Sequence, residues 1–594
     1  MGVFADQLVR RADDRLAALI DRLADATGGH RVVMAEIREA VCGFVDPRSR
    51  FRDDPAAEDA AVRRLPVLAG LQDDDGLFTS SGNVSSPPDS AFSLNDAGQV
   101  ALLLVRRGQL APVAAALGAV LDRATPALVT GGVHTPNHRW EISAALARID
   151  ALRPDPAVRA RIEQWLAEGV DIDGDGIYSE RSANYAAYVS NPSLLVLADL
   201  LDRPRLAELV HRNLHAQADL TDHTGLVETV FSRRQDQKML DHRHDHDGFA
   251  GGPFLPQYHR FALAGCHDCA RSVDRLVGHE LRTGGSTLDP TTLLLDQLEG
   301  TLPEDPTQRS STPAGTTLTA RTFGGTGLAV ARTVDSQLTV NAGSDVARAG
   351  RIGSGLAANP TLLRWRTGDV CLNSVRISRD AFGFGPFRAD LLEDLGDGFG
   401  PGDPDGSGRA EPGTSAGEHR WRLTEELTAA YYQPLSADRR RDSGRYDLGF
   451  DGRFSASMSF AERETDRLGF RTTLTVGAAS ARVWLGAVFD GPAVAQCVEF
   501  GFSPGGRVDG AEQLDEDRWR IGTGPVTYTR GATTVEIIAA GPAVRSGRGT
   551  EGVFYEPGEA YGFLGGTDAV GGPRLYLPLS SPGLVGVVIT SRPA

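Results

Sequence analysis

Residues 171–188, DIDGDGIYSERSANYAAY, separate two long helical patterns and decide how the chain is interpreted. Asp, Gly and Ser in the first part of this stretch predict a turn, and Tyr185 and Tyr188 follow at helical spacing. On either side, over residues 1–300, Leu and Ala recur at three- and four-residue intervals between Gly, Pro and Asp. The first half is therefore predicted to be a stack of helices, in which each tyrosine either faces a cleft or packs between helices.

The pattern changes after residue 300. Pro, Thr, Ser and Gly are concentrated in residues 301–318, which predicts a linker. Beyond the linker, short alternating apolar runs such as residues 481–489, ARVWLGAVF, are separated by Gly-rich turns. We therefore predict a multidomain chain, α then β, with a helical domain over residues 1–300, a linker over 301–318 and a large antiparallel β-sandwich domain over 319–594.

Composition excludes several classes of protein. The 594-residue chain has a formal net charge of −17, which argues against coating nucleic acid or binding a membrane surface through basic residues. Its N-terminus is charged every few residues and is typical of an amphipathic helix, not of a signal peptide. The five cysteines are too few for a disulfide framework. We expect a cytoplasmic protein that binds neither nucleic acid nor membrane, and the sequence makes no prediction of its oligomeric state.

A first polar cluster, residues 133–141, VHTPNHRWE, opens a helical pattern. Pro136 suits the first position of a helix, and Asn137 could cap that helix. An amide at a helix start is equally well placed to hold a carboxylate, because the free backbone N–H groups and the helix dipole act in the same direction. Capping alone does not account for His138 and Trp140, so both interpretations stay open.

Two patterns raise the question of a metal. Asp171, Asp173 and Asp175 imitate the start of a calcium loop, but Ser182 stands where that loop needs a bidentate glutamate, so a turn is the simpler interpretation. Cys266 and Cys269 lie within a helical pattern and lack a second cysteine pair, which favours small core residues. We expect no cofactor to be required, with a structural Ca²⁺ or Zn²⁺ as the alternative.

The densest charged segment is residues 228–247, ETVFSRRQDQKMLDHRHDHD. The adjacent Arg233 and Arg234 can form forked hydrogen bonds with a carboxylate or a sulfate. His242, His244 and His246 alternate, so an extended backbone would turn them to one face, a spacing that permits metal coordination. A solvated charged loop, an anion site and a proton-accepting histidine all remain open for this segment.

Taken together, these motifs resemble those of a known group of enzymes. DGIYSERSANYAAY resembles the DG-x-(Y/F)-x-E-x-S-x-x-Y-x-x-Y stretch of the heparinase II/III-like and related alginate lyases, and PNHRWE resembles the start of one of their helices. The resemblance implies an incomplete (α/α) toroid followed by an antiparallel β-sandwich. It also implies a polysaccharide lyase that cleaves uronic acid-containing glycans by β-elimination and takes an acidic oligosaccharide as its substrate.

The resemblance also implies roles for individual residues. Asn137 would neutralise the uronate carboxylate, and His138 would assist or act as the base. Tyr185, with Tyr188 as the alternative, would be the acid and could also be the base. The remaining predicted substrate contacts are Arg233, Arg234, Trp140, Glu180, His242 and His244.

Two other functions compete with the lyase. An (α/α) barrel can host an inverting glycoside hydrolase, which needs two carboxylates roughly 6.5–9.5 Å apart; the candidates are Glu141, Glu180, Glu228 and Asp236. A non-catalytic carbohydrate-binding protein is the third interpretation. The absence of an apparent leader favours cleavage of imported oligosaccharides, and therefore an exolytic lyase.

Overall fold

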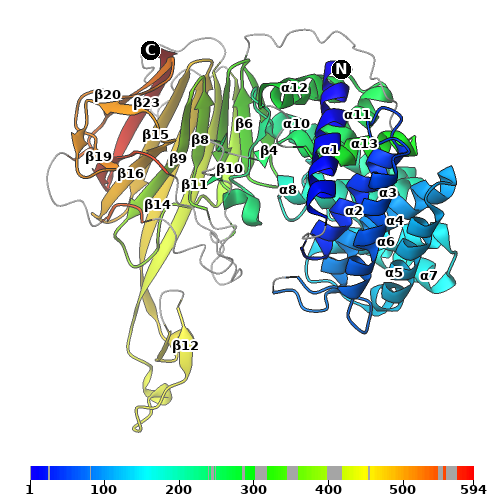
Figure 1. The fold of residues 1–594 in the computed structure, drawn as a ribbon. Coiled ribbons are helices and arrows are strands. Elements are labelled where there is room, and N and C mark those ends of the chain that lie inside the picture. The colour runs from blue at the N-terminus through cyan, green and yellow to red at the C-terminus, as the bar shows by residue number, and fades with distance from the viewer. Residues whose placement is uncertain are drawn as a thin grey trace. The chain divides into compact units, whose positions relative to one another are not determined.

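In the computed structural model the chain forms two compact units, which we describe separately (Figure 1). The helical unit comprises residues 1–227 and 250–312, and the sheet unit comprises residues 228–249 and 313–594. The described residues are 2–23, 27–80, 82–238, 240–241, 246–247, 249–283, 288–300, 318–343, 345, 359–397, 418–451, 455–545, 553–556 and 571–594.

The helical unit is built from α-helices joined by short turns. They are α1 (Gly2–Arg22), α2 (His30–Val45), α3 (Pro55–Gly70), α4 (Pro87–Arg107), α5 (Ala111–Thr130), α6 (Pro136–Leu152), α7 (Pro156–Ala167), α8 (Ala183–Tyr185), α9 (Asn191–Leu200), α10 (Pro204–Leu220), α11 (Leu255–Leu263), α12 (His267–Thr283) and α13 (Pro290–Glu299). A π-helix, η1 (Ala186–Ser190), joins α8 to α9, and a 3-10 turn, η3 (Gly252–Phe254), precedes α11.

These helices form two concentric layers. In the inner layer α2 packs on α4, α4 on α6, and α6 on η1 and α9; η1 contacts η3, α11 contacts α13, and α13 packs back on α2. The outer layer consists of α1, α3, α5, α7, α10 and α12, each packed against one or two inner helices. The most deeply buried inner helix is α6, in which every residue from Trp140 to Asp150 is buried. The arrangement is the predicted (α/α) toroid.

A turn recurs three times in the helical unit, after α3, α7 and α10. In each copy one aspartate oxygen, Oδ1 of Asp73, Asp173 or Asp222, accepts backbone hydrogen bonds from the residues two and four positions later. A glycine follows each aspartate after three residues and has φ of +77°, +90° or +93°, a conformation that disfavours other residues. The Asp-rich segment at residues 171–176 is therefore one copy of a repeated turn, and its central carboxylate serves the backbone.

Among the described residues, one helix has the length and mean hydropathy of a membrane span, α5. It contains Asp122 and Arg123, and its buried side chains, which include Val113, Leu117 and Leu121, face the neighbouring helices α3, α4 and α6. This pattern is that of an outer helix of the toroid.

The sheet unit contains two large sheets. The first has the strand order β18-β19-β22-β16-β9-β8-β7-β6-β5 and the second β10-β11-β14-β15-β23-β21-β20-β17. All neighbouring pairs with a described register are antiparallel except β19 with β22, which is parallel. The bounds are β5 (Thr319–Phe323), β6 (Leu328–Arg332), β7 (Ser336–Asn341), β8 (Leu363–Thr367), β9 (Val370–Arg379), β10 (Leu391–Asp397), β11 (His419–Tyr432), β14 (Thr465–Ala479), β15 (Arg482–Asp490), β16 (Ala495–Phe502), β17 (Arg507–Asp509), β18 (Glu512–Gln513), β19 (Arg518–Arg520), β20 (Val526–Arg530), β21 (Thr533–Ala540), β22 (Arg574–Ser580) and β23 (Gly583–Pro593).

One hydrophobic core joins the two sheets. It includes Trp365 and Leu372 from the first sheet and Trp421, Val476 and Ile589 from the second. The remaining short elements of the sheet unit are η2 (Gln235–Lys238), β2 (Leu240–Asp241), β3 (His246–Asp247), η5 (Ala437–Arg439), β12 (Leu448–Phe450), β13 (Ser455–Ser457) and η6 (Phe460–Glu462). In the sequence, β1 (Leu226–Val227) belongs to the helical unit, and β4 (Phe249–Ala250) has one residue in each unit. The predicted order, helices followed by a β-sandwich, is confirmed.

The segment 228–249 belongs to the sheet unit, whereas the sequence pattern had assigned it to the helical domain of residues 1–300. The physical reason lies in Glu228, which is 1% exposed. Its carboxylate accepts hydrogen bonds from Thr339 on β7 at 3.0 Å and from Arg364 on β8 at 2.6 Å. A buried ion pair, which no local periodicity reveals, holds this stretch against the first sheet.

Candidate functional site

The polar cluster predicted at residues 133–141 lies at the N-terminal end of the inner helix α6. Thr135 is the N-cap residue, with extended φ and ψ of −140° and 153°, and Pro136 occupies the first helical turn. The side chain of Thr135 makes no capping hydrogen bond. Asn137 lies inside the helix, one position past Pro136, so the proposed capping role for Asn137 is wrong. The first backbone N–H groups of α6 have no side-chain cap, which favours an anion there.

Asn137 is 1% exposed and joins α6 to the turn after α7. Its Nδ2 donates a short hydrogen bond to Oε2 of Glu180, which is also buried. Among the described residues, the buried Oδ1 of Asn137 has no hydrogen-bond partner. Leaving such an atom unsatisfied costs about 1–3 kcal/mol, so a buried acceptor of this kind indicates a ligand or an ordered water.

His138 lies beside Asn137 and is 8% exposed. Its ring packs edge-to-face on the exposed His134 at 4.7 Å and on Phe92 of α4 at 6.2 Å between centroids. The guanidinium of Arg31, at the start of α2, stacks on Phe92, with its central carbon 4.0 Å from the ring centroid. Imidazole, aromatic and guanidinium groups from three inner helices therefore meet at their N-terminal ends.

A second buried set continues around the same end of the inner helices. His30 Nδ1 is 2.8 Å from the hydroxyl of Ser93, and its Nε2 is 3.2 Å from the Asp89 carboxylate. Arg31 also pairs with Asp89. Desolvation acts to raise the pKa of Asp89, but the hydrogen bond from His30 and the charge of Arg31 outweigh it and lower the pKa. Sequence reasoning missed this set because its members come from two helices about 60 residues apart and match no local motif.

Trp140 has a packing role. It is fully buried, its indole N–H lies 3.4 Å from Oδ1 of Asp171, and the Arg139 guanidinium stacks 4.6 Å from its ring. Asp171 also accepts a hydrogen bond from Arg139 at 3.1 Å. These contacts tie α6 to the turn after α7 and leave no face of the indole for a sugar, so the structure favours packing over the predicted substrate contact.

Tyr185 and Tyr188 lie where the α-helix widens into the π-helix η1. The hydroxyl of Ser182 caps this helix by accepting a hydrogen bond from the backbone N–H of Tyr185 at 3.1 Å. Tyr185 is half-buried and Tyr188 is 51% exposed. Because a π-helix has a wider turn than an α-helix, it changes the relative direction of the two rings, and such segments are frequent at functional sites. The α-helical spacing assumed from the sequence is therefore corrected here.

A buried amide network supports η1 from behind. The Tyr178 hydroxyl donates to Oδ1 of Asn191 at 2.8 Å, and Nδ2 of Asn191 donates to Oδ1 of Asn213 at 3.0 Å and to Oε1 of Gln257 at 3.1 Å. Gln257 in turn donates to the backbone oxygen of Ala187, inside η1, at 2.8 Å. Side chains from α9, α10 and α11 thus fix the backbone that carries both tyrosines.

The two tyrosines differ in their surroundings. Although Tyr188 is half exposed, desolvation by the surrounding protein, followed by the charges of Asp289 and Glu280, raises its pKa to about 12. A raised pKa keeps the hydroxyl protonated near pH 7, which suits a proton donor and opposes a base. The cations that a tyrosine base would need to lower its pKa are not the groups acting on Tyr188.

The predicted anion-binding arginines lie in the sheet unit. Arg233 forms a forked ion pair with Asp345, with Nε to Oδ2 at 2.8 Å and Nη2 to Oδ1 at 2.9 Å. The backbone N–H of Arg234 donates to the hydroxyl of Ser232, which donates to Asp236 at 2.5 Å. The structure therefore favours a structural role for Arg233. His242 and His244 lie outside the described residues.

Four carboxylates had been considered for a hydrolase. Glu141 accepts hydrogen bonds from Asn95 at 3.1 Å and from Ser193 at 2.8 Å, and desolvation raises its pKa to about 7 despite these bonds. Glu228 behaves oppositely: burial acts to raise its pKa, but Arg364 and Arg366 outweigh burial and lower it. Of the four, only Glu141 and Glu180 belong to the helical unit with Asn137.

Comparison with solved structures identifies the fold. The chondroitin AC lyase of Streptomyces coelicolor A3, in complex with chondroitin sulphate, is similar with a TM-score of 0.53 and 15% identity over 99% of this chain and 79% of that one. Heparinase III is similar with a TM-score of 0.51 and 10% identity over 96% and 79%. A xanthan lyase of Paenibacillus is similar with a TM-score of 0.50 and 9% identity over 98% and 56%.

No protein-family model matches the sequence, and no curated protein sequence matches it significantly. The chain therefore has the helical toroid and β-sandwich fold found in polysaccharide lyases, and the fold that the motif resemblance implied is confirmed. At these identities the likeness establishes the fold alone, and the activity has to be argued from the site.

Proposed function

We propose that this protein is a polysaccharide lyase that cleaves a uronic acid-containing glycan by β-elimination. The observation that carries the proposal is Asn137, a buried amide with an unsatisfied oxygen at the uncapped N-terminal end of an inner helix. The edge-to-face pair His134 and His138 and the π-helix η1, which contains Tyr188 and follows Tyr185, belong to the same unit. We expect an acidic oligosaccharide as the substrate and exolytic cleavage.

The elimination requires neutralisation of the uronate carboxylate. Breaking the C5–H bond moves charge into that carboxylate, and hydrogen-bond donors fixed around it stabilise the charge as it develops. The first N–H groups of α6 and the helix dipole supply such donors, and the bond to Glu180 fixes the plane of the Asn137 amide. The unsatisfied Oδ1 of Asn137 would accept a hydrogen bond from a sugar hydroxyl, and the second hydrogen of its Nδ2, which the bond to Glu180 does not use, would be donated to the uronate carboxylate.

The remaining chemistry is the movement of two protons. A base removes the C5 proton, the electron pair of the broken bond forms the C4=C5 double bond, the C4–O4 bond breaks, and an acid protonates the departing O4. We assign the acid to Tyr185, with Tyr188 as the alternative. The base is either His138, which keeps the C5 proton while a protonated Tyr185 gives its own proton to O4, or Tyr185 itself, which starts as the phenolate, takes the C5 proton and passes it to O4.

The hydrolase alternative is less well supported. It needs two carboxylates on opposite sides of a sugar, one with a raised pKa. Glu141 has the raised pKa, but both of its oxygens already accept hydrogen bonds, one from the partly buried Asn95 and one from the buried Ser193. Glu180 accepts the hydrogen bond of Asn137. These contacts indicate that Glu141 and Glu180 hold neighbouring side chains in place and do not act as a pair of reacting carboxylates.

The test is a screen of uronate-containing oligosaccharides from several glycan classes. A lyase produces an unsaturated uronate, which absorbs ultraviolet light and has the mass expected for cleavage without water. A hydrolase adds the mass of water and produces no new absorbance. Products with added water, or tight binding of a glycan with no product, would contradict the proposal and select the hydrolase or the binding protein.

A further inference from the structure

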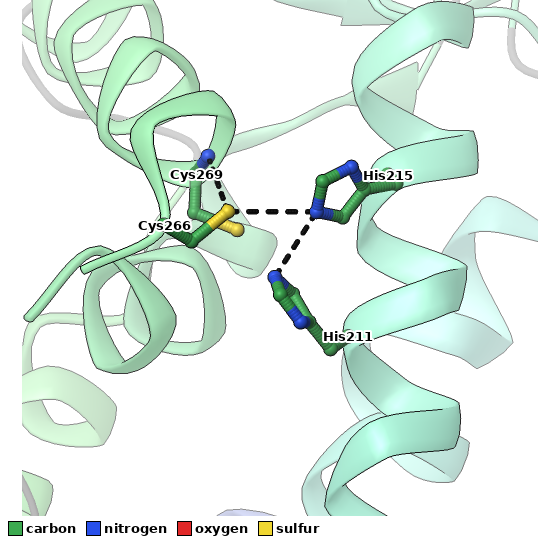
Figure 2. A group of neighbouring side chains, drawn as sticks. All are labelled: His211, His215, Cys266 and Cys269. Atoms are coloured by element: carbon green, nitrogen blue, oxygen red, sulfur yellow. Dashed lines mark hydrogen bonds between the residues drawn. The ribbon is translucent and has the colours of Figure 1, made fainter. Parts of the chain in front are cut away.

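Four potential metal ligands gather on the outer side of the helical unit, away from α6. His211 and His215 come from α10, and Cys266 and Cys269 come from the start of α12 (Figure 2). One ligand atom from each residue lies within 4.8 Å of all the others. Figure 2 shows the two imidazoles pointing from one helix toward the two sulfur atoms of the other segment. The two pairs are about 50 residues apart in sequence, so only folding brings them together.

The spacing within each pair suits coordination. His211 and His215 are four residues apart, which places both rings on one face of α10. Cys266 and Cys269 follow the C-x-x-C spacing common in zinc sites. Sequence reasoning treated the cysteines as core residues because the partner pair is a histidine pair on another helix and not a second C-x-x-C.

The distances are close to those of a tetrahedral site. His211 Nε2 lies 3.0 Å from His215 Nε2, which lies 3.5 Å from Cys266 Sγ. Zinc bonds of about 2.1 Å to nitrogen and about 2.3 Å to sulfur place neighbouring ligand atoms of a tetrahedron roughly 3.3–3.8 Å apart. These two separations lie within tenths of an ångström of the tetrahedral values, and because all four ligand atoms lie within 4.8 Å of one another, the widest pair would close by up to about 1 Å around one ion.

The neighbouring groups orient the ligands. His215 Nδ1 lies 3.6 Å from the Asp268 carboxylate, an arrangement that turns Nε2 toward the sulfur atoms and is typical of zinc-bound histidines. The ring of His211 stacks on Phe261, with centroids 4.4 Å apart and planes 5° apart. The backbone N–H of Cys269 donates to Cys266 Sγ at 3.5 Å, which holds the two cysteines of the C-x-x-C segment together.

We propose that His211, His215, Cys266 and Cys269 bind one structural Zn²⁺ ion. Two imidazoles and two thiols form the borderline-soft donor set that Zn²⁺ prefers, whereas Ca²⁺ and Mg²⁺ prefer oxygen. Four protein ligands complete a tetrahedron and leave no position for a substrate, which is the mark of a structural site.

The ion would join α10 to the start of α12 and so stabilise the helices whose side chains support η1, the π-helix that follows Tyr185 and contains Tyr188. Asn213 lies between the two histidines on α10, and Gln257 lies on α11, the neighbour of α12; both belong to the amide network behind η1. Metal binding would therefore stabilise the part of the toroid that holds Tyr185 and Tyr188, without touching substrate.

The test is the metal content of the full-length protein, prepared without a histidine tag. We expect about one Zn²⁺ per chain by elemental analysis. Cobalt exchange on the unaltered protein should give the intense visible bands of tetrahedral Co²⁺ together with sulfur-to-cobalt charge-transfer absorbance. This measurement requires no variant, so it does not depend on whether a variant folds.

Variants then locate the ion. Cys266→Ala and His211→Ala should each lose the metal and lower the melting temperature, and a chelator should lower the melting temperature of the wild-type chain in the same way. The matched controls are Cys42→Ala, a buried cysteine of α2, and His223→Ala, an exposed histidine; both should keep the metal. Protein that takes up no Zn²⁺ or Co²⁺, metal retained in Cys266→Ala, or a Cys266–Cys269 disulfide found by mass spectrometry would each overturn the proposal.

Discussion

The two polar regions that stand out in the sequence differ in how their hydrogen-bonding capacity is satisfied. In the sheet unit, three polar side chains of the charged segment at residues 228–236 have described partners: Glu228 pairs with Arg364, Arg233 with Asp345, and Ser232 with Asp236. In the helical unit, the start of α6 has an N-terminus without a side-chain cap and a buried amide oxygen without a partner among the described residues. The denser charge therefore marks structure, and the sparser cluster marks the candidate site.

Two buried glutamates, one in each unit, differ in the direction of their pKa shifts. Glu141 and Glu228 are 4% and 1% exposed. Burial dominates at Glu141 and raises its pKa to about 7, whereas two arginines outweigh burial at Glu228 and lower its pKa. Similar burial thus yields opposite shifts, and the difference is the presence of a compensating cation.

The largest effect is expected for Tyr185→Phe, which removes the proposed acid and keeps the ring. Loss of a general acid costs roughly 10²–10⁴ in rate, so the formation of unsaturated product should fall by that factor while oligosaccharide binding persists. Turnover is followed by ultraviolet absorbance, and binding by calorimetry.

Two other tyrosines of the same unit complete the comparison, Tyr178 as the matched control and Tyr188 as the alternative acid. Tyr178→Phe removes a buried hydroxyl that bonds Asn191, so it should lower stability and leave most turnover intact. Tyr188→Phe tests the alternative acid. Normal turnover in Tyr185→Phe together with lost turnover in Tyr188→Phe would transfer the role to Tyr188.

Glu228→Gln should produce the largest loss of stability. Breaking a buried ion pair leaves Arg364 with an uncompensated charge and costs about 3–5 kcal/mol. Because the pKa of Glu228 is lowered, wild-type stability from this group is present above its ordinary pKa of 4.5 and is lost as the pH falls below it. Denaturant unfolding of the full chain measures the change, with the exposed Glu516→Gln as the control. A neutral result would show that the pair does not anchor the segment.

Glu141→Gln should have the opposite effect and raise the stability of the protein at high pH. The pKa of Glu141 is raised from 4.5 to about 7, so the folded state holds the proton more tightly and wild-type stability falls as the pH rises from 4.5 to 7. The variant should be more stable than wild type at pH 8 by up to about 3 kcal/mol and equal to it at pH 4. Unfolding measured at both pH values checks this, and a variant less stable at pH 8 would refute the assignment.

Arg233→Ala should have the smallest effect. Its ion pair with Asp345 is partly exposed, with 35% of the arginine side chain accessible, and such pairs contribute about 0.2–1 kcal/mol. Turnover at saturating substrate should be unchanged. A large loss of substrate affinity would instead restore the anion-binding role that the sequence suggested.

Regular periodicity made much of the fold predictable. Three- and four-residue apolar repeats indicated the helices and alternating runs indicated the sandwich, while two short motifs, one at Asn137 and one at Glu180 and Tyr185, led to the proposed site. These signals are local, so a single sequence carries them. The repeated Asp–Gly turn at Asp73, Asp173 and Asp222 is also a local pattern. The sequence analysis considered only its middle copy, because that copy resembles the start of a calcium loop.

The features of the fold and of the candidate site that the sequence did not predict depend on contacts between residues far apart in the chain. The Glu228–Arg364 pair joins residues 136 positions apart, and it determines which unit residues 228–249 join. The π-helix after Tyr185 depends on Gln257, which lies on another helix. The capping prediction for Asn137 failed by two positions because the oxygen of Glu180, not the helix end, binds its amide. No spacing rule within one segment contains this information.

The central claim is that Asn137 and the start of α6 bind the uronate carboxylate during elimination. The most direct test compares Asn137→Ala with wild type in the absorbance assay on whichever oligosaccharide the wild-type protein cleaves. Loss of a positioned donor of this kind costs about 10²–10³ in rate, so we predict that fall in product formation with the fold intact by circular dichroism. An Asn137→Ala protein that forms unsaturated product at the wild-type rate would contradict the account.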